Sequence, residues 1–376
     1  MSATAPEAPD TGLLEVVTDA TVPVGASGAP FRPTPAGFAA RVGVLVALLA
    51  LVLAVPQLVP GVYVNVVTKA AVYGLVALSL NVLLGYAGLV SLGHSAFFGV
   101  GAFGAGYALT KMQLPWGAAV LMAALTGAVA AVVLGAIALR LRAVYFTLVT
   151  ISYGFVAQET LFNIRSLTGG GAGQPAPRPS LFHSDVRYAY LCIGILAVAM
   201  VFDWRFTASR GGRAVQALRD DERVAASWGI DVTGYKIMAF VISGIMAGIA
   251  GALFASIEQV VTPADFGFAL SLTFLLATVV GGAGNRWGVV QGGILFAVLP
   301  TIIDRAHANF HVWPFTAISI TLEPAVEALL LILTLIFFPG GIAQQQRNLL
   351  SWLSFKRFRQ PEAGGGPARG GMGARP

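Results

Sequence analysis

Apolar runs long enough to cross a membrane follow one another along this chain from Arg41 almost to Pro339. Bilayer hydrocarbon is about 30 Å thick, and a helix needs around 20 mostly apolar residues to cross it. The run over 42–59 shows no alternation, whereas the strands of a transmembrane barrel alternate in hydrophobicity over about ten residues. Only 11% of the residues are charged, against roughly 25% in soluble domains. The sequence therefore predicts an all-α polytopic membrane protein.

The expected number of helices follows from the apolar segments. These segments are 40–59, 62–84, 88–110, 116–139, 143–163, 187–203, 236–257, 271–284, 287–303 and 324–339. The segment 271–284 is short for a full crossing. Together with the segment that follows it, it forms either two crossings or a re-entrant hairpin packed inside protein. We expect about ten transmembrane or re-entrant helices.

The distribution of positive charge predicts the orientation of these helices. With ten crossings and both termini in the cytoplasm, seventeen Lys and Arg residues lie inside, five lie outside, and Lys69 lies within a helix. Cytoplasmic loops of membrane proteins carry an excess of Lys and Arg, so both termini are predicted to be cytoplasmic. The chain divides into a disordered tail at 1–37, a transmembrane domain at 38–342 and a basic, Gly-rich cytoplasmic tail at 343–376.

The cytoplasmic loop over 204–235 is unlike the rest of the chain. Good helix formers fill 213–228, and Gly229 stands where a helix C-cap takes a left-handed residue. A narrow apolar stripe runs beside dense charge and consists of Ala214, Leu218, Ala225 and Trp228. Such a helix is either a solvated or lipid-lying connector or a docking helix for a soluble partner. The acidic residues at 220–222 disfavour anionic lipid and so favour docking.

The sequence offers no energy source of its own. It contains no Gly-x-x-x-x-Gly-Lys-[Ser/Thr] phosphate loop, so ATP-driven transport would need another subunit to bind ATP. Ion coupling would need ionisable groups in the membrane, and the candidates are scattered: Lys69, Glu159, Glu258, Glu323 and Glu327. An intramembrane enzyme would need a catalytic pair on one helix face, and none is visible. The single cysteine, Cys192, excludes a disulfide framework and a thiolate metal site, and we expect no metal site.

Glycines crowd the region 85–106. Most are expected in close helix packing, as are the Gly-x-x-x-Gly patterns at 244–248 and 288–292. The stretch 99–104 has the spacing of a dinucleotide fingerprint, but it lies within an apolar helix with no strand before it, so that interpretation is rejected. A further hypothesis is that 85–95 interrupts a helix, as broken helices do in transporters. It would place three polar side chains on a translocation path: Ser91, His94 and Ser95.

Several blocks in a fixed order resemble one family, the permease subunits of bacterial branched-chain amino acid ABC importers, and specifically the LivM-like half of the permease pair. The blocks are Leu80-Asn81-Val82-Leu83-Leu84-Gly85-Tyr86-Ala87-Gly88, Ser91-Leu92-Gly93-His94-Ser95-Ala96-Phe97-Phe98-Gly99, Tyr145-Phe146-Thr147-Leu148-Val149-Thr150, Leu167-Thr168-Gly169-Gly170, Gly212-Arg213-Ala214, Gly229-Ile230, Tyr235-Lys236, Gly281-Gly282-Ala283-Gly284 and Trp287-Gly288. They cover about residues 62–342. Arg223, where relatives commonly have an apolar residue, and Phe103, in place of a frequent Tyr, depart from the pattern.

The resemblance implies a permease without enzymatic activity in the bacterial inner membrane, importing branched-chain or related small amino acids. Its implied partners are a LivH-like second permease, two ATP-binding subunits that carry ATP and Mg, a periplasmic solute-binding protein and membrane lipid, with no nucleic acid. It also implies that 204–235 is the coupling segment, shaped by Arg213, Asp221, Glu222 and Gly229. A urea or short-amide ABC permease and an ion-coupled secondary transporter are the alternatives.

Overall fold

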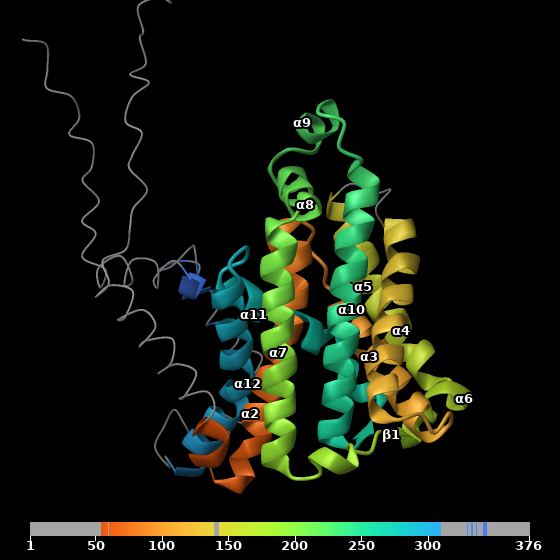
Figure 1. Ribbon diagram of the computed structural model, residues 1–376, viewed down its shortest axis with the longest axis vertical. Helices are drawn as coiled ribbons and strands as arrows, with labels where there is room; N and C mark the ends of the chain where they lie inside the picture. The colour runs from red at the N-terminus through yellow and green to blue at the C-terminus, as the bar shows by residue number, and fades with distance from the viewer. Residues whose placement is uncertain are drawn as a thin grey trace, which may run out of the picture. The chain divides into compact units, whose positions relative to one another are not determined.

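A computed structural model of the chain describes residues 54–58, 60–138 and 143–309, together with 329, 332, 333, 336 and 341–343. The predicted tails lie outside these residues, apart from Ala343. Most of the predicted segments 40–59 and 324–339 also lies outside them, as do Glu323 and Glu327. The described residues all belong to the unit that begins at Ala54, and Figure 1 shows its helices.

Eight long helices account for most of the described residues and follow the predicted segments from 62 to 303. They are α2 (Gly61–Asn81), α3 (His94–Thr110), α4 (Trp116–Ala138), α5 (Ala143–Glu159), α7 (Asp185–Ala208), α10 (Val232–Glu258), α11 (Phe268–Gly281) and α12 (Arg286–Asn309). Six spans among the described residues are long and apolar enough to cross a membrane, the one ending with α11 beginning at Pro263. The other two helices, α3 and α5, have 17 residues each, which is about the lower limit for a crossing. The predicted polytopic α-helical fold is confirmed at this level.

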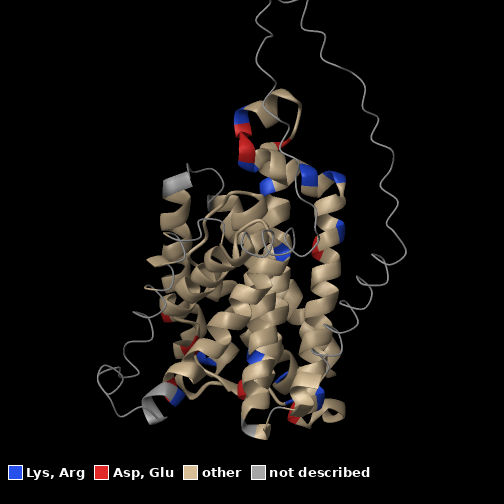
Figure 2. Ribbon diagram, turned by 90° about the vertical axis from the view of Figure 1, so that its left-hand side faces the viewer, with Lys and Arg blue, Asp and Glu red and all other residues tan. Residues whose placement is uncertain are grey.

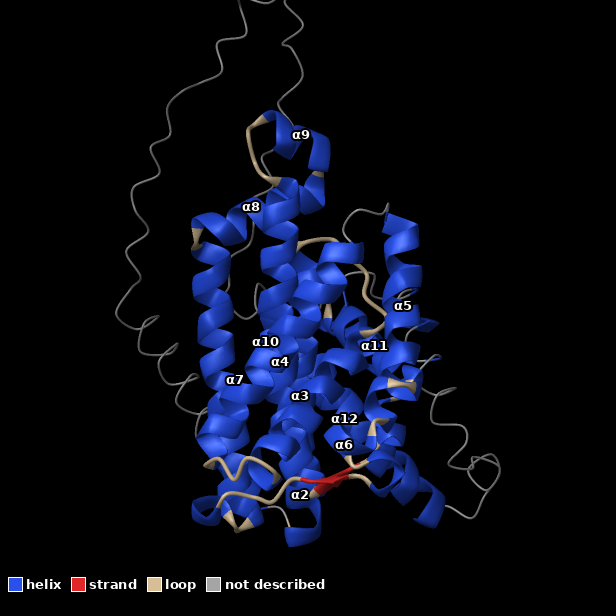
Figure 3. Cartoon of the chain, turned by 90° about the vertical axis from the view of Figure 1, so that its right-hand side faces the viewer, coloured by secondary structure: helices blue, strands red, loops and turns tan. Residues whose placement is uncertain are grey.

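Short elements connect the long helices. They are η1, a π-helix (Val82–Tyr86), η2 (Leu161–Asn163), α6 (Arg165–Thr168), η3 (Gly170–Ala172), β1 (Gln174–Pro175), η4 (Ser180–Phe182), α8 (Arg210–Asp220), α9 (Glu222–Ser227), β2 (Val260–Val261) and η5 (Pro263–Phe266). β1 and β2 pair antiparallel, with Gln174 opposite Val261. Figure 3 shows this ribbon at the end of the helices opposite to α8 and α9. We call these two ends the β end and the α8 end.

Close backbone contacts set α10 against α3 and α4. A Cβ atom on Gly101 of α3 would overlap the backbone of Gly248, and a Cβ on Gly127 of α4 would overlap the carbonyl of Gly244. Only glycine fits such contacts, because the two helix backbones touch directly. The packing role predicted for 244–248 is therefore confirmed, and α10 lies against both neighbours along its length.

The hairpin of α11 and α12 runs between the two ends. Its turn, at Gly282–Asn285, lies beside Arg219 of α8, while the far end of α12 reaches the start of α2, where Arg305 Nε donates to the Tyr63 hydroxyl at 3.1 Å. Gly292 of α12 lies against the carbonyl of Ala277 in α11, so the helices pack closely. Of the two predicted alternatives for 271–303, this arrangement favours two crossings over a re-entrant hairpin.

Most of the coloured Lys, Arg, Asp and Glu residues lie toward the two ends of the helices, and residues of other kinds fill most of the length between them (Figure 2). At the β end Lys69 pairs with Glu258, their charged atoms 2.7 Å apart, and Arg178 pairs with Asp185. At the α8 end Lys236 pairs with Glu222 at 2.5 Å. Such a distribution is expected when the middle of each helix lies in hydrocarbon, where charge is costly.

Candidate functional site

The helix over the Leu80–Gly88 motif is interrupted. The α-helix α2 gives way to the π-helix η1, and the residues at 87–93, which we call the break, are not helical before α3 begins at His94. Two threonines of α5 bond to the break: Leu92 N–H donates to Thr150 Oγ1 at 3.1 Å, and Thr147 Oγ1 donates to Val90 O at 3.3 Å. Non-helical backbone inside a membrane needs such partners. The predicted interruption at 85–95 is present.

The three polar residues predicted for a translocation path are buried in this conformation. Ser91, His94 and Ser95 are each at most 1% exposed. His94 and Ser95 lie where α2, α3 and α11 meet: His94 Nε2 is 2.7 Å from Ser79 Oγ, and Ser271 Oγ donates to Ser95 Oγ at 2.7 Å. The structure thus buries all three and bonds His94 and Ser95 to polar side chains of α2 and α11, and their part in a translocation path stays a prediction.

The hydrogen bonds of Ser79 assign the tautomer of His94. Ser79 Oγ donates its only proton to Val76 O at 2.7 Å, so it must accept from His94 Nε2–H. The other ring nitrogen, Nδ1, is then an acceptor, and within the described residues neither it nor Ser91 Oγ has a hydrogen-bond partner. Each unpaired buried polar atom costs about 1–3 kcal/mol, so this buried group is polar but incompletely bonded.

A second polar group lies at the α8 end, and we call it the junction. It joins η1, α7, α8 and the turn between α11 and α12 through Asn81, Gly85, Tyr86, Asp203, Arg219, Gly284 and Arg286. Asp203 Oδ2 accepts from the Tyr86 hydroxyl and from Arg286 Nε, both at 2.9 Å. Asn81 Oδ1 accepts from Gly284 N–H at 2.7 Å. Asp203 is only 1% exposed, so its charge depends on Arg286 for compensation.

Sequence reasoning did not find the junction. Two signals in the sequence were available: Asp203 is a lone carboxylate near the end of an apolar segment, and Arg286 is a lone cation in a glycine-rich turn. Opposite charges of this kind pair when they are buried. Their distance along the chain, 83 residues, hides the pairing from any local pattern.

The segment 210–228, which we call the docking segment after its predicted role, differs from the prediction of one helix over 213–228. It forms two helices, α8 and α9, and ends at Trp228, the C-cap of α9. Asp221 is extended and separates the two helices, because its side chain accepts from Arg223 N–H and Val224 N–H and so caps α9. The predicted apolar stripe is also divided. Leu218 and Ala225 are buried, whereas Trp228 is 81% exposed and its neighbour at helical spacing, Val224, is 53% exposed.

Each of the four residues predicted to shape the coupling segment has a defined conformation or contact within or next to that segment. Asp221 caps α9, and Glu222 pairs with Lys236 of α10. Arg213 donates from Nη1 to Ala208 O at 2.6 Å, across the turn between α7 and α8. Gly229 has φ +78°, the left-handed conformation expected of a C-cap glycine. Their role in coupling stays a prediction.

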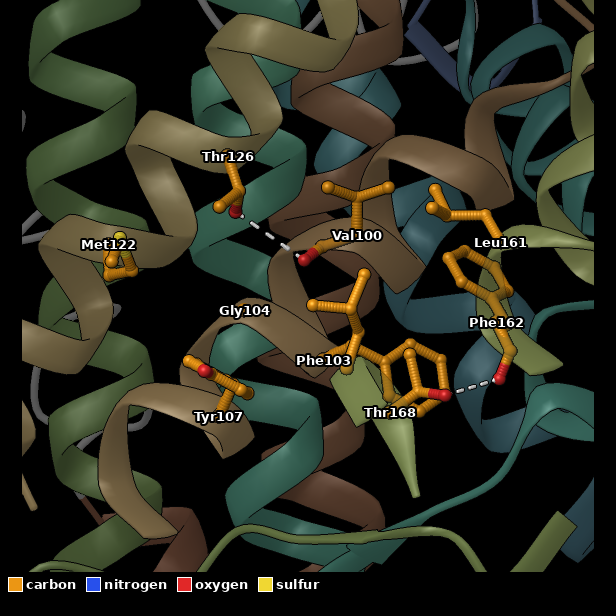
Figure 4. A pocket seen from close by; sticks show the side chains of 10 residues that line it. Val100, Phe103, Gly104, Tyr107, Met122, Thr126, Leu161, Phe162 and Thr168 are labelled. Atoms are coloured by element: carbon orange, nitrogen blue, oxygen red, sulfur yellow. Dashed lines mark hydrogen bonds between the residues drawn. The ribbon is translucent and has the colours of Figure 1, made fainter. Parts of the chain in front are cut away.

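An apolar cavity of about 190 Å³ lies between α3, α4 and the segment η2–α6 (Figure 4). Its two threonines turn their hydroxyls to the backbone: Thr126 Oγ1 donates to Val100 O at 3.4 Å, and Thr168 Oγ1 donates to Phe162 O at 2.6 Å. The wall is otherwise formed by apolar residues and Tyr107. The cavity therefore offers space for hydrocarbon and no charged group to bind an ionic ligand.

The remaining ionisable residues do not form a relay in the part of the chain that is described. Lys69 and Glu258 pair with each other at the β end, and Glu159 is exposed at the end of α5. The described ranges contain no group of three His, Cys, Asp or Glu side chains placed to hold a metal ion. Cys192, in α7, is buried.

Comparison with known proteins connects this architecture to transport. Residues 62–338 match the family model described as the permease component of branched-chain amino acid transport systems. The chain is 33% identical over 282 residues to the high-affinity branched-chain amino acid transport system permease protein LivM of Escherichia coli K12, and 32% identical to LivM of Salmonella typhimurium LT2. Each match covers 68% of this chain and 66% of that protein, just under two thirds of its length. The LivH permease of E. coli K12 is 26% identical over 306 residues, covering 74% of this chain and 93% of LivH.

Proposed function

The chain belongs to the family of permease components of branched-chain amino acid transport systems, and from this premise we propose that it is a transmembrane subunit of an ATP-driven amino acid importer. The observation that carries the proposal is the docking segment. It projects beyond the long helices and presents Trp228 and Val224 to solvent, in a chain whose sequence contains no phosphate loop. An exposed tryptophan beside a second apolar side chain, on an otherwise charged segment, is typical of a docking contact.

The proposed partner of the docking segment is an ATP-binding subunit. Val224 and Trp228 are four residues apart and share one helix face, so they can enter a groove together. Around them stand Asp220, Asp221 and Glu222, which disfavour an anionic membrane surface. The permease itself performs no covalent chemistry: ATP and Mg are bound, and ATP is hydrolysed, by the partner subunits.

The orientation we propose places the α8 end in the cytoplasm. The positive-inside rule supports it, since 204–235 carries five Arg residues and Lys236 follows directly. With ten crossings, both termini then lie in the cytoplasm, and the β end faces the periplasm of a bacterial inner membrane. There a solute-binding protein delivers the substrate, and a LivH-like second permease completes the membrane part of a complex with two ATP-binding subunits.

The proposed translocation path includes Ser91, His94 and Ser95. In the described conformation they are buried, so the path is closed at this depth. Alternation between states that bind substrate differently would expose them. The proposed place for that change is the break, which contains the unpaired Ser91 hydroxyl and ends at His94, whose Nδ1 is also unpaired among the described residues. The proposed substrate is a branched-chain or related small amino acid; urea or a short amide is the alternative within ABC permeases.

Co-purification and reconstitution test the proposal. The complex is purified from the native membrane with wild-type chain, with Trp228→Ala, and with Leu181→Ala, a control that removes a side chain 78% exposed at the β end. We expect ATP-binding subunits and a second permease with wild type and with Leu181→Ala, and loss of the ATP-binding subunits with Trp228→Ala, because Trp228 fills the partner groove.

The opposite result would favour the ion-coupled alternative. A wild-type chain that comes away alone even after cross-linking, and that takes up amino acids in liposomes under an ion gradient without ATP, would contradict the ATP-driven proposal. Uptake of leucine against uptake of urea by the reconstituted complex separates the two substrate classes.

A further inference from the structure

Arg219 joins the docking segment to the interrupted helix. It stands in the last turn of α8, and its Nη1 donates to the carbonyl of Gly85 at 2.5 Å. Its aliphatic stem lies over Gly88, where a Cβ atom would be 3.2 Å from Arg219 Cγ. The same Nη1 would be 3.1 Å from a Cβ atom on Gly284. A single side chain of α8 therefore contacts η1, the break and the α11–α12 turn.

The carbonyl of Gly85 accepts this bond because the helix is interrupted there. In a continuing α-helix, the amide of Leu89 would donate to it. Leu89 N–H bonds instead to Leu83 O at 2.9 Å, and Ala87 N–H bonds to Val82 O at 3.2 Å. Arginine commonly bonds carbonyls at helix C-terminal ends, where its charge also suits the helix dipole. Arg219 can therefore bond Gly85 only because the helix is interrupted; in an unbroken helix the Gly85 carbonyl would already accept from the Leu89 amide.

The backbone around Arg219 is closely packed. A Cβ atom on Gly85 would overlap Asn81 Oδ1 and Gly284 N, two atoms that are themselves hydrogen-bonded. Gly88 and Gly284 both have positive φ, +69° and +91°, which glycine adopts without strain. Because no space separates these segments, a displacement of Arg219 must move the backbone of Gly85 or break its hydrogen bond.

The residue after Gly85 is fixed to a different helix. Tyr86 donates to Asp203 of α7, which also bonds Arg286 at the start of α12. Gly85 is thus bonded to α8, while Tyr86 is bonded to α7 and α12. If α8 moves relative to α7, Gly85 is pulled with α8 while Tyr86 is held by α7, so the backbone between them must change. The break begins directly after Tyr86.

We propose that Arg219 is a positioning residue that transmits movement of the docking segment to the break. It acts between the ATP-binding subunit, which moves α8 and α9, and the break, whose far end is the start of α3 at His94. The inference rests on the proposed function and adds to it the residue through which coupling passes. Arg219 transmits the movement, and Trp228 docks the partner.

The test separates coupling from assembly. In the purified complex, reconstituted in liposomes, Arg219→Met is compared with wild type for subunit composition, ATP hydrolysis, substrate transport and amide hydrogen exchange over 85–90. We expect the ATP-binding subunits to remain at the wild-type ratio and transport per ATP to fall about tenfold, a size typical of coupling between two sites. Exchange of the amides over 85–90 should become faster, because this segment loses the restraint of the Arg219 contact and opens locally more often.

Two further variants control the result. Arg210→Met removes an exposed arginine from the other end of the same helix and should leave transport per ATP and exchange unchanged. Arg219→Gln, whose amide still donates one hydrogen bond, should lose less transport per ATP than Arg219→Met. If Arg219→Met is not inserted in the membrane, a fall in transport per ATP in Arg219→Gln is the result that supports the inference.

Three results would overturn parts of the scheme separately. Wild-type transport per ATP with unchanged exchange over 85–90 in the Arg219 variants would overturn the inference. Loss of ATP-binding subunits in those variants would assign Arg219 to docking and also overturn it. Absence of ATP-binding subunits from the wild-type complex would overturn the proposed function instead. In that case, faster exchange over 85–90 in Arg219→Met than in wild type would still show that Arg219 contacts this segment.

Discussion

Asp203 is the residue on which the junction depends most. Its carboxylate accepts from Tyr86 and Arg286 and is almost fully buried. Removal of the carboxylate would therefore leave both Tyr86 and Arg286 without this hydrogen-bond acceptor. Breaking a buried ion pair from one side typically costs about 3–5 kcal/mol, because the remaining charge is left unpaired, whereas replacing both partners with apolar residues is often neutral. The chemistry of a single carboxylate therefore stabilises contacts among η1, α7 and α12.

Asp203→Ala is accordingly expected to destabilise the protein by about 3 kcal/mol, since it leaves the Arg286 charge unpaired. The double variant Asp203→Leu with Arg286→Met should recover most of that loss. The measurement is thermal unfolding of the purified protein in detergent. As a control, Glu258→Gln removes a half-exposed partner of Lys69 and should cost at most about 1 kcal/mol. Equal losses for Asp203→Ala and Glu258→Gln would show that the junction is not a buried pair in solution.

Individual side chains were predicted unevenly from the sequence. The left-handed Gly229 followed from its place after a run of helix formers, because a C-cap needs only local pattern. Arg219 looked like any charge on a solvated helix face. Its contact with Gly85 depends on a carbonyl freed 134 residues earlier in the chain, and no local rule connects the two.

Glycines in the apolar helices have very different surroundings. Gly248 of α10 lies against the carbonyl of Ala123, and Gly101 packs onto it. Gly194 of α7 has no atom within 4 Å of the position of a Cβ among the described residues. Gly248 and Gly194 both lie in apolar helices, but only at Gly248 is another helix backbone so close that no side chain fits between them.

Gly248→Leu is therefore expected to force α10 away from α3 and α4 and to destabilise the protein by about 2–3 kcal/mol through overpacking. Gly194→Leu, the matched control, should be tolerated because its side chain points into open space. The amount of folded protein in the membrane and its melting temperature measure both. A Gly194→Leu loss as large as that of Gly248→Leu would mean that α7 is covered by a partner at this position.

The elements themselves were largely predictable, and the exceptions have physical reasons. Eight predicted apolar segments became helices, because hydrocarbon leaves the backbone no other way to bond its polar groups. The docking segment was predicted as one helix and is two. Aspartate is favoured at a helix N-cap and disfavoured inside a helix, where its side chain competes with the helical hydrogen bonds. Asp221 therefore caps α9 and ends α8. Leu218 and Ala225 are buried, so the docking face is narrower than the sequence stripe.

The described helices have two dissimilar ends, and the proposed function requires each to face a particular compartment. The α8 end carries the docking segment, and the β end carries the ribbon and the loops around it. In the proposed orientation, Leu181 at the β end lies in the periplasm and Ser227 in the cytoplasm.

Reporter insertions check this orientation. Alkaline phosphatase, which is active only outside the cytoplasm, should be active when inserted after Leu181 and inactive when inserted after Ser227, because η4 and α9 lie at opposite ends of the helices. The reverse activities would invert the topology and remove the docking segment from the reach of any cytoplasmic ATP-binding subunit.

The burial of Cys192 makes the native chain a ready background for thiol chemistry. It is the one cysteine in the sequence, and it is 1% exposed within α7, so a maleimide or spin-label reagent has no accessible native target while the fold is intact. Cysteines introduced in pairs, on the docking segment and at the β end, would carry labels without first removing any residue. Distances between such labels would then follow the transport cycle in an otherwise unaltered protein.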